Sequence, residues 1–269
     1  MSWHPGEVAL QAKLGVAERM AELGQRVLRD HMIEQHRDFF PLLPFAVLGA
    51  VDPAGDVWAT IRSAPPGFLH AIDPWELAVD LPRDRHDPAD AGMEDGDRVA
   101  LLGIQLSSRR RNRANGRVRR LGDAGFSIAV EQSFGNCPKY ITAREPSLPP
   151  RRPGSAPDEA TIRDIVGRAD TFFVASSADG AVDVSHRGGE PGFVRMDGQG
   201  RLTIPDYPGN MFFNTLGNFL VNAKGGLAFP DFTNGGLLQM SGEVEVIVES
   251  PQTRFWRFTP RRTLFSPAP

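Results

Sequence analysis

Residues 185–189 combine the groups that a phosphate site requires. Ser185 supplies a hydroxyl, Arg187 supplies a permanent cation with two parallel N–H donors, and Gly188 and Gly189 allow backbone N–H groups to approach a ligand closely. The same letters also fit an ordinary turn beside a solvated arginine, so two interpretations are open. The segment lies among short apolar runs separated by Gly, Pro, Asn and Asp, which is typical of antiparallel strands.

The other reactive side chains suggest less chemistry. The histidines have no metal-ligand spacing, and we predict no metal site. His186 has no visible orienting partner, so hydrogen bonding to a phosphate is a better role for it than general-base catalysis. The arginines of 109–113 form either an anion clamp or a solvated hairpin. Cys137 is either a reactive thiol or, as we prefer, a small buried side chain. No catalytic residue is predicted.

Composition sets wide limits on the function. The chain has 269 residues, of which 41% are hydrophobic and 23% are charged, enough for one large domain or two small ones. A formal net charge of −3 argues against a nucleic-acid-binding surface. The single cysteine excludes an internal disulfide. No signal peptide and no apolar run of about 20 residues is visible, so we expect a cytoplasmic protein with no membrane partner.

The pattern along the chain predicts four segments. Residues 1–40 are amphipathic at helical period, and we expect one or two helices, broken at Gly15 or Gly24, that act as a lid or dimerisation arm or pack outside the next domain. Residues 41–143 contain short strands separated by turns. Residues 144–157 contain five prolines and suit a semi-rigid linker. Residues 158–269 begin with a short helix capped by Asp158 and return to strands.

The two β-rich segments resemble each other. The run Pro66-Gly67-Phe68 recurs 125 residues later as Pro191-Gly192-Phe193. This frame places Thr60 on Ser185 and Arg62 on Arg187, and a frame one residue longer places Arg113 on Gln239. We therefore predict a tandem duplication of one small barrel. Two such barrels would pack as a homodimer does and leave a ligand site in the groove between them.

Several motifs resemble the pyridoxamine 5′-phosphate oxidase-like FMN-binding split barrels, and in the first half a tandem-barrel bacterial subgroup of them. They are the segments 183–189, 191–195, 203–206, 208–210, 214–218 and 237–242, with 109–117 and 132–141. The resemblance implies a mainly β fold with added helices, in which two tandem split β-barrels form an intramolecular pseudo-dimer behind an N-terminal helical segment. It also implies FMN as the cofactor.

The resemblance places the FMN site on residues from both halves. The phosphate would be held by Ser185, His186, Arg187, Gly188, Asn210, Asn214 and Asn218. The flavin ring would lie against Ile204, Pro205, Asp206 and Gln239. The first barrel would complete the site with Gln132, Ser133 and Asn136, and the repeat adds Arg113.

The chain also departs from the oxidase proper. Residues 209–214 (GNMFFN) stand where the oxidase has an Arg-Lys pair, and its C-terminal substrate-gripping segment is not recognisable. The resemblance therefore favours an FMN-dependent oxidoreductase acting on an unidentified small organic substrate, with a separate flavin or iron–sulfur reductase as one source of electrons. A non-catalytic flavin-binding or flavin-sensing module and a haem-binding protein are the alternatives. Either a monomeric pseudo-dimer or a homodimer fits.

Overall fold

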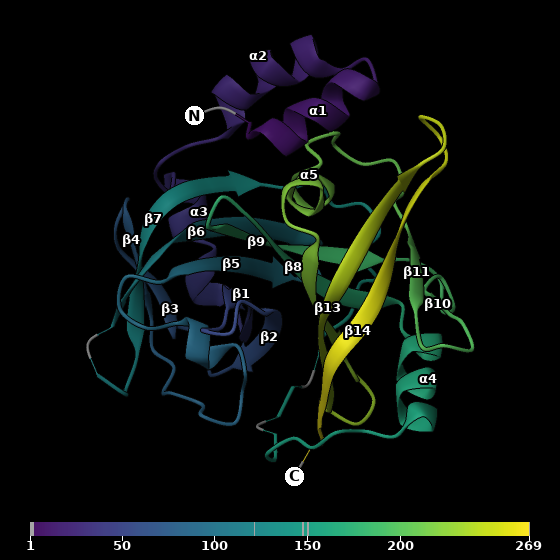
Figure 1. Cartoon of the computed structure of the whole chain (residues 1–269). Helices are drawn as coiled ribbons and strands as arrows, with labels where there is room; N and C mark the ends of the chain where they lie inside the picture. The colour runs from purple at the N-terminus through teal and green to yellow at the C-terminus, as the bar shows by residue number, and fades with distance from the viewer. Residues whose placement is uncertain (1–2, 121, 147, 150, 269) are drawn as a thin grey trace.

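A computed structural model describes residues 3–120, 122–146, 148–149 and 151–268 (Figure 1). Two antiparallel sheets stand side by side, and the two N-terminal helices cover one end. The first sheet contains β1 (Phe45–Val51), β2 (Val57–Ser63), β3 (Leu69–Asp73), β4 (Glu76–Val79), β5 (Arg98–Gln105), β6 (Arg110–Arg120) and β7 (Phe126–Gly135). The second contains β8 (Thr171–Ala178), β9 (Ala181–Gly188), β10 (Arg195–Met196), β11 (Leu202–Pro205), β12 (Lys224–Pro230), β13 (Leu237–Val248) and β14 (Arg254–Ser266).

The two sheets have the same strand order. The first runs β2-β1-β5-β6-β7-β4-β3, and the second, listed from its other end, runs β9-β8-β12-β13-β14-β11-β10. Each strand of the second sheet thus takes the position of the strand seven earlier in the chain. The predicted tandem duplication is therefore confirmed by topology.

Three apolar clusters make the two sheets one pseudo-dimer. One lies inside the first sheet, around Trp58 and Leu101, and another lies inside the second, around Phe172 and Trp256. The third joins the sheets and contains Val47 and Ala100 from one and Phe173, Ala175 and Ala228 from the other. This cluster corresponds to the predicted contact between the barrels.

The helices lie at the ends of the sheets. They are α1 (Pro5–Lys13), α2 (Ala17–Val27), α3 (Glu34–Arg37), α4 (Glu159–Arg168) and α5 (Asn214–Val221), with 3₁₀ turns η1 (Phe40–Leu42) and η2 (Asp90–Gly92). The predicted break at Gly15 is present, with φ of 69°. Asp158 caps α4 by accepting a hydrogen bond from the Thr161 N–H (2.8 Å). Among the helices of the described residues, none is long and apolar enough to cross a membrane.

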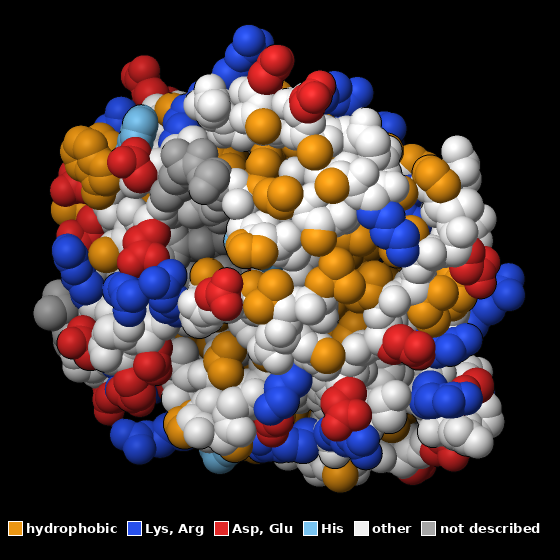
Figure 2. Space-filling model, turned by 45° about the horizontal axis from the view of Figure 1, so that its top comes forward, with side chains coloured by type: hydrophobic (Ala, Val, Ile, Leu, Met, Phe, Trp, Pro, Cys, Tyr) orange, Lys and Arg blue, Asp and Glu red, His pale blue; other side chains and the backbone are white. Residues whose placement is uncertain are grey.

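The N-terminal helices pack on α5, and Met20 of α2 shares an apolar cluster with Phe134 of β7. Gly6 of α1 and Gly217 of α5 touch through their backbones, and Gln11 donates a hydrogen bond to the Phe212 carbonyl (3.2 Å). Figure 2 shows this end of the molecule, where apolar side chains gather in the middle of the face and charged ones surround them. Leu220 and Val221 of α5 are among the exposed apolar residues. The N-terminal segment therefore supports the helix that begins at the candidate site.

Close backbone packing between the barrels gives a first prediction. A Cβ atom at Gly226 of β12 would lie 2.5 Å from the Val57 carbonyl oxygen and 2.6 Å from the Trp58 Cα of β2. Gly226→Ala should lower the free energy of unfolding by about 1–3 kcal/mol, because backbone atoms have to move. Urea denaturation measures the loss. Gly198→Ala, whose Cβ would meet nothing within 4 Å, is the control. Equal stability of the two variants would contradict the described contact.

Candidate functional site

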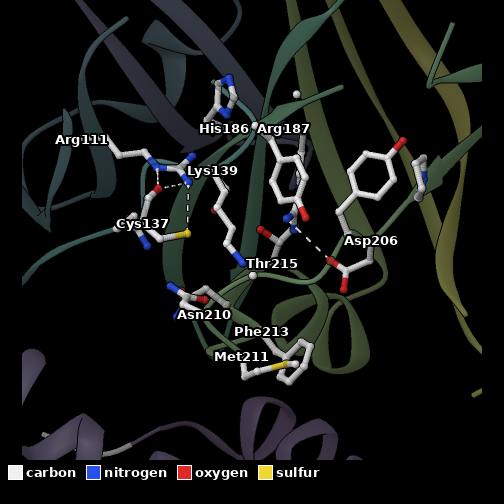
Figure 3. A pocket seen from close by; sticks show the side chains of 18 of the residues that line it. Arg111, Cys137, Lys139, His186, Arg187, Asp206, Asn210, Met211, Phe213 and Thr215 are labelled. Carbon is white, nitrogen blue, oxygen red and sulfur yellow. Dashed lines mark hydrogen bonds and ion pairs between the residues drawn. The ribbon is translucent and has the colours of Figure 1, made fainter. Parts of the chain in front are cut away.

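The principal cleft of the described residues lies between the two barrels. One wall comes from β6 and the segment after β7, and the other comes from β9, the end of β11 and the start of α5 (Figure 3). The empty space is about 800 Å³, including the part that opens to solvent. The stacked rings of Tyr140 and Tyr207, 5.2 Å apart, lie at the exposed rim and join the two walls. These are the two tyrosines of the chain.

Helix α5 begins at the floor of the cleft without a cap. Phe213, the residue before it, has a left-handed backbone (φ 63°), and no side chain caps the first turn. The first N–H groups of a helix carry a partial positive charge and need an acceptor. The Thr215 hydroxyl oxygen is also buried without a partner among the described residues. The helix start therefore presents unused donors to the cleft.

Arg187 points at the same region from β9. Its Nη1 lies 3.7 Å from Asp206 Oδ1, and its buried Nε has no hydrogen-bond partner in the described part of the chain. Asp206 is already held by Arg254, whose Nε donates to Oδ2 at 3.0 Å. Asp206 thus orients Arg187 without satisfying it, which leaves donors for an anion.

Two further cations come from the first barrel. Arg111 donates through Nε and Nη2 to the Cys137 carbonyl (3.0 and 2.6 Å) and makes no ion pair with a described residue. Burial, and then the nearby charge of Arg113, lowers the pKa of Arg111 to about 10. Lys139 is exposed and extends towards the start of α5 (Figure 3). Cys137 is half-buried and lines the cleft, so its thiol is less enclosed than predicted.

Arg113 is engaged by the protein itself. Its Nε lies 2.8 Å from Asp183 Oδ1 and donates to the Val184 carbonyl (3.1 Å), while its other nitrogens donate to Asn136 and Ser185. It therefore clamps the first barrel to β9 and is neutralised there, which leaves less of its charge for a ligand.

His186 is buried between cations. Desolvation, reinforced by Arg111 and Arg187, holds the pKa of its imidazole well below 6.5, so the ring is neutral. Its Nε2 is buried and has no hydrogen-bond partner within the described structure. A neutral ring with a free nitrogen can donate one hydrogen bond to an anion, as predicted, or bind a metal through its lone pair.

The cleft brings together ten of the fifteen residues that the sequence predicts for the site. They are Arg113, Asn136, Ser185, His186, Arg187, Gly188, Pro205, Asp206, Asn210 and Asn214. Five others do not line it, namely Gln132, Ser133, Ile204, Asn218 and Gln239.

The physical reasons for these five differ. Ile204 and Ser133 point away from the cleft, since neighbouring strand residues face opposite ways: Ile204 packs in the second core, and Ser133 bonds the His36 ring at 2.8 Å. Gln132 belongs to β7 and is absent from the cleft lining. Asn218, one turn further along α5, donates to Ser176 Oγ (2.9 Å). Gln239 lies in a different cleft, which is described below.

Some lining residues escaped sequence reasoning. Lys139, Tyr140, Tyr207, Phe213 and Thr215 were not predicted as site residues, and Arg111 was left undecided. Tyr140 (φ 62°) and Phe213 have a left-handed backbone, which the sequence does not indicate because non-glycine residues rarely adopt it. The one usable signal was the position of Thr215 within the motif 214–218.

Comparison with known proteins shows the following. No family model and no curated protein matches the chain. Heme storage protein HutZ from Vibrio cholerae is 12% identical, covers 40% of this chain and 94% of its own, and has a TM-score of 0.31. An FAD-binding protein from Mesorhizobium loti is 10% identical, with 43% and 99% covered and a TM-score of 0.34. A pyridoxinephosphate oxidase family protein from Clostridium acetobutylicum is 12% identical, with 39% and 85% covered and a TM-score of 0.31.

Likenesses at these values carry nothing about the chemistry of the cleft. The fold is read from the chain itself, whose two sheets share one strand order, each around its own core and joined by a third. The chain therefore has the predicted architecture, a tandem pair of barrels that form an intramolecular pseudo-dimer.

Proposed function

We propose that the chain binds FMN in the principal cleft, with the phosphate at the start of α5, and serves as an FMN-dependent oxidoreductase for a small organic substrate. The observation that carries the proposal is the set of unused donors: Arg187 Nε, His186 Nε2 and Thr215 Oγ1 are all buried without partners in the described structure. Unsatisfied buried polar groups cost free energy, so their gathering in one cleft calls for an acceptor.

The donor set suits a phosphate ester. A helix N-terminus, a guanidinium and a hydroxyl together favour a compact dianion. Arg111 and Lys139 add positive charge from the first barrel, which offsets the cations missing from residues 209–214. The negative charge of Asp206 is already offset by Arg254.

The rim determines how a planar ring reaches the cleft. Tyr140 and Tyr207 are stacked, and the Tyr140 hydroxyl donates to the Pro208 carbonyl (2.9 Å), so the two walls are joined there. A tricyclic ring requires this pair to separate, after which both tyrosines can pack against it. Bound flavin supplies the redox chemistry, while these residues set its position and its exposure to solvent. Electrons would come from NAD(P)H or a separate reductase.

Haem is the second candidate ligand. The neutral, unpartnered Nε2 of His186 has the form of an axial ligand, and this observation favours haem. The abundance of donors around it favours a phosphate, because an axial site needs one nitrogen and gains nothing from the unused Thr215 hydroxyl.

Titration of the purified protein with FMN and, separately, with haemin tests the proposal. We expect saturable quenching of flavin fluorescence, a flavin absorption spectrum that persists through gel filtration, and bleaching by NADPH under anaerobic conditions. If flavin binds but neither NADPH nor an added reductase bleaches it, the chain is a non-catalytic storage or sensing module. A Soret band that His186→Ala abolishes, with no flavin retained, would replace FMN by haem.

A further inference from the structure

A second, smaller cleft lies between the barrels at the position related to the first by the internal repeat. It holds about 340 Å³ of empty space, and its lining includes Asp87, Arg151, Arg152 and Gln239. By the strand equivalence, β2 takes here the part that β9 plays in the first cleft, and β13 takes the part of β6. The two clefts are equivalent by the repeat, but among the described residues only the first contains buried side-chain donors without partners.

Individual hydrogen bonds confirm the equivalence. In the first cleft, Arg113 Nε donates to the Val184 carbonyl at 3.1 Å. In the second, Gln239 Nε2 donates to the Ala59 carbonyl at 3.0 Å. Gln239 corresponds to Arg113 in the repeat, and Ala59 lies 125 residues before Val184, as Thr60 does before Ser185. Gln239 therefore occupies the position equivalent to Arg113, but it lies in the second cleft and not in the first, where it was predicted to lie.

The second cleft already contains an acid group supplied by the chain, Asp87, and burial raises the pKa of its carboxyl above the usual range. The Asp87 carboxylate is buried and accepts hydrogen bonds from the Thr60 hydroxyl, from Gln239 Nε2 (3.1 Å) and from the Ala89 N–H (3.0 Å). These are a β2 hydroxyl, a side chain of the opposite barrel and a backbone N–H at the start of a helical turn. The same three kinds of donor line the first cleft.

Two arginines at or beside the second cleft are also engaged. Arg62, the counterpart of Arg187, donates to the Pro82 carbonyl (2.6 Å) and lies 3.8 Å from Asp90. Arg151 from the linker donates to the Ile61 carbonyl. The counterpart of α5 is reduced to the three-residue turn η2. No buried atom of its lining residues lacks a partner in the described structure, in contrast to the first cleft.

We propose that the second cleft is a latent anion site that the Asp87 carboxylate occupies, so that the chain binds one flavin phosphate and not two. The count of one flavin rests on the proposed function of the first cleft. The latent site itself does not, because it can be tested with inorganic phosphate. Removing the carboxylate would take the acceptor of the Thr60 hydroxyl, one of the two acceptors of Gln239 Nε2 and a negative charge near Arg151, and so open the place to a phosphate ion.

Calorimetric titration with inorganic phosphate tests the latent site in a background that weakens the first one. The protein carrying Arg187→Ala is compared with the double variant Arg187→Ala/Asp87→Ala. We expect the double variant to bind phosphate at least 10-fold more tightly, with one additional ion per chain. The control is Arg187→Ala/Asp84→Ala, which removes a carboxylate of the same cleft that does not hold these donors. It should behave as Arg187→Ala alone.

Each outcome decides the proposal. A folded double variant that gains no phosphate binding, or a control that gains as much, would overturn the role of Asp87. If Asp87→Ala does not fold, the stoichiometry of FMN on the unmodified chain decides: one flavin per chain is expected, and two would overturn the inference. An unmodified chain that binds no FMN, beside a double variant that does gain phosphate, would refute the proposed function and leave the latent site standing.

Discussion

Replacing Arg187 by alanine is expected to raise the dissociation constant for FMN by about 10- to 100-fold. Charge-assisted hydrogen bonds to a phosphate are worth about 1.5–3 kcal/mol, and each 1.4 kcal/mol is a factor of ten in affinity. The fold should tolerate the change, because Arg187 is 3.7 Å from its one acidic neighbour, Asp206, which keeps its bond to Arg254. Fluorescence titration with FMN measures the effect.

Three variants make this measurement specific. Arg195→Ala removes an exposed cation from β10 of the same barrel, and Arg62→Ala removes the counterpart of Arg187 in the first barrel. Both should bind FMN as the unmodified chain does. Arg187→Lys keeps the charge without the planar fork and should fall between the extremes. If Arg187→Ala folds and binds FMN with unchanged affinity, the phosphate does not lie at this turn.

The sequence predicted those parts of the fold that local patterns determine. Strand and turn residues alternate along both halves. The Pro-Gly-Phe repeat makes Thr60 and Arg62 equivalent in position to Ser185 and Arg187. The topology then follows, because a duplicated unit folds twice in the same way. Segments 185–188 and 205–206 were predicted from their residue types and the family resemblance, and each contributes neighbouring residues to one wall of the cleft.

Residues that depend on long-range placement were missed or misplaced. Tyr140 and Lys139 reach the site because the chain crosses the interface after β7, and no local pattern indicates where that segment runs. Gln239 shows a subtler limit. A pseudo-dimer has two equivalent clefts, and the motif that marks a position does not say which cleft it faces. Only the contact between β13 and β2 across the interface shows which cleft Gln239 faces.

The contact between α1 and α5 was also invisible in the sequence, and it produces the second large expected effect. Glu7 of α1 is 5% exposed, accepts a hydrogen bond from the His4 N–H (2.9 Å) and accepts another from Asn214 Nδ2, the first residue of α5. The His4 ring lies 3.8 Å away, and Arg113 and Asp183 contribute opposing fields. Burial dominates and raises the pKa of Glu7 to about 7.

The sign of the pH effect follows from this direction. The folded chain binds the Glu7 proton more tightly than the unfolded chain, so the contribution to stability is complete below pH 4.5 and is lost as the pH rises through about 7. A shift of this size corresponds to about 3 kcal/mol. The glutamine in Glu7→Gln cannot ionise. Relative to that of the unmodified chain, the free energy of unfolding of this variant should therefore rise by up to about 3 kcal/mol between pH 5 and pH 8.5.

Urea denaturation of the FMN-free protein at several pH values measures this difference, and the difference between variants cancels the titration of every other group. Glu18→Gln, on the exposed side of α2, is the matched control and should follow the unmodified chain at each pH. If the free energy of unfolding of Glu7→Gln instead changes with pH in parallel with that of the unmodified chain, the Glu7 carboxylate is solvated in the folded protein. In that case α1 does not seal the start of α5, and the unused donors at that helix end would face water instead of a ligand.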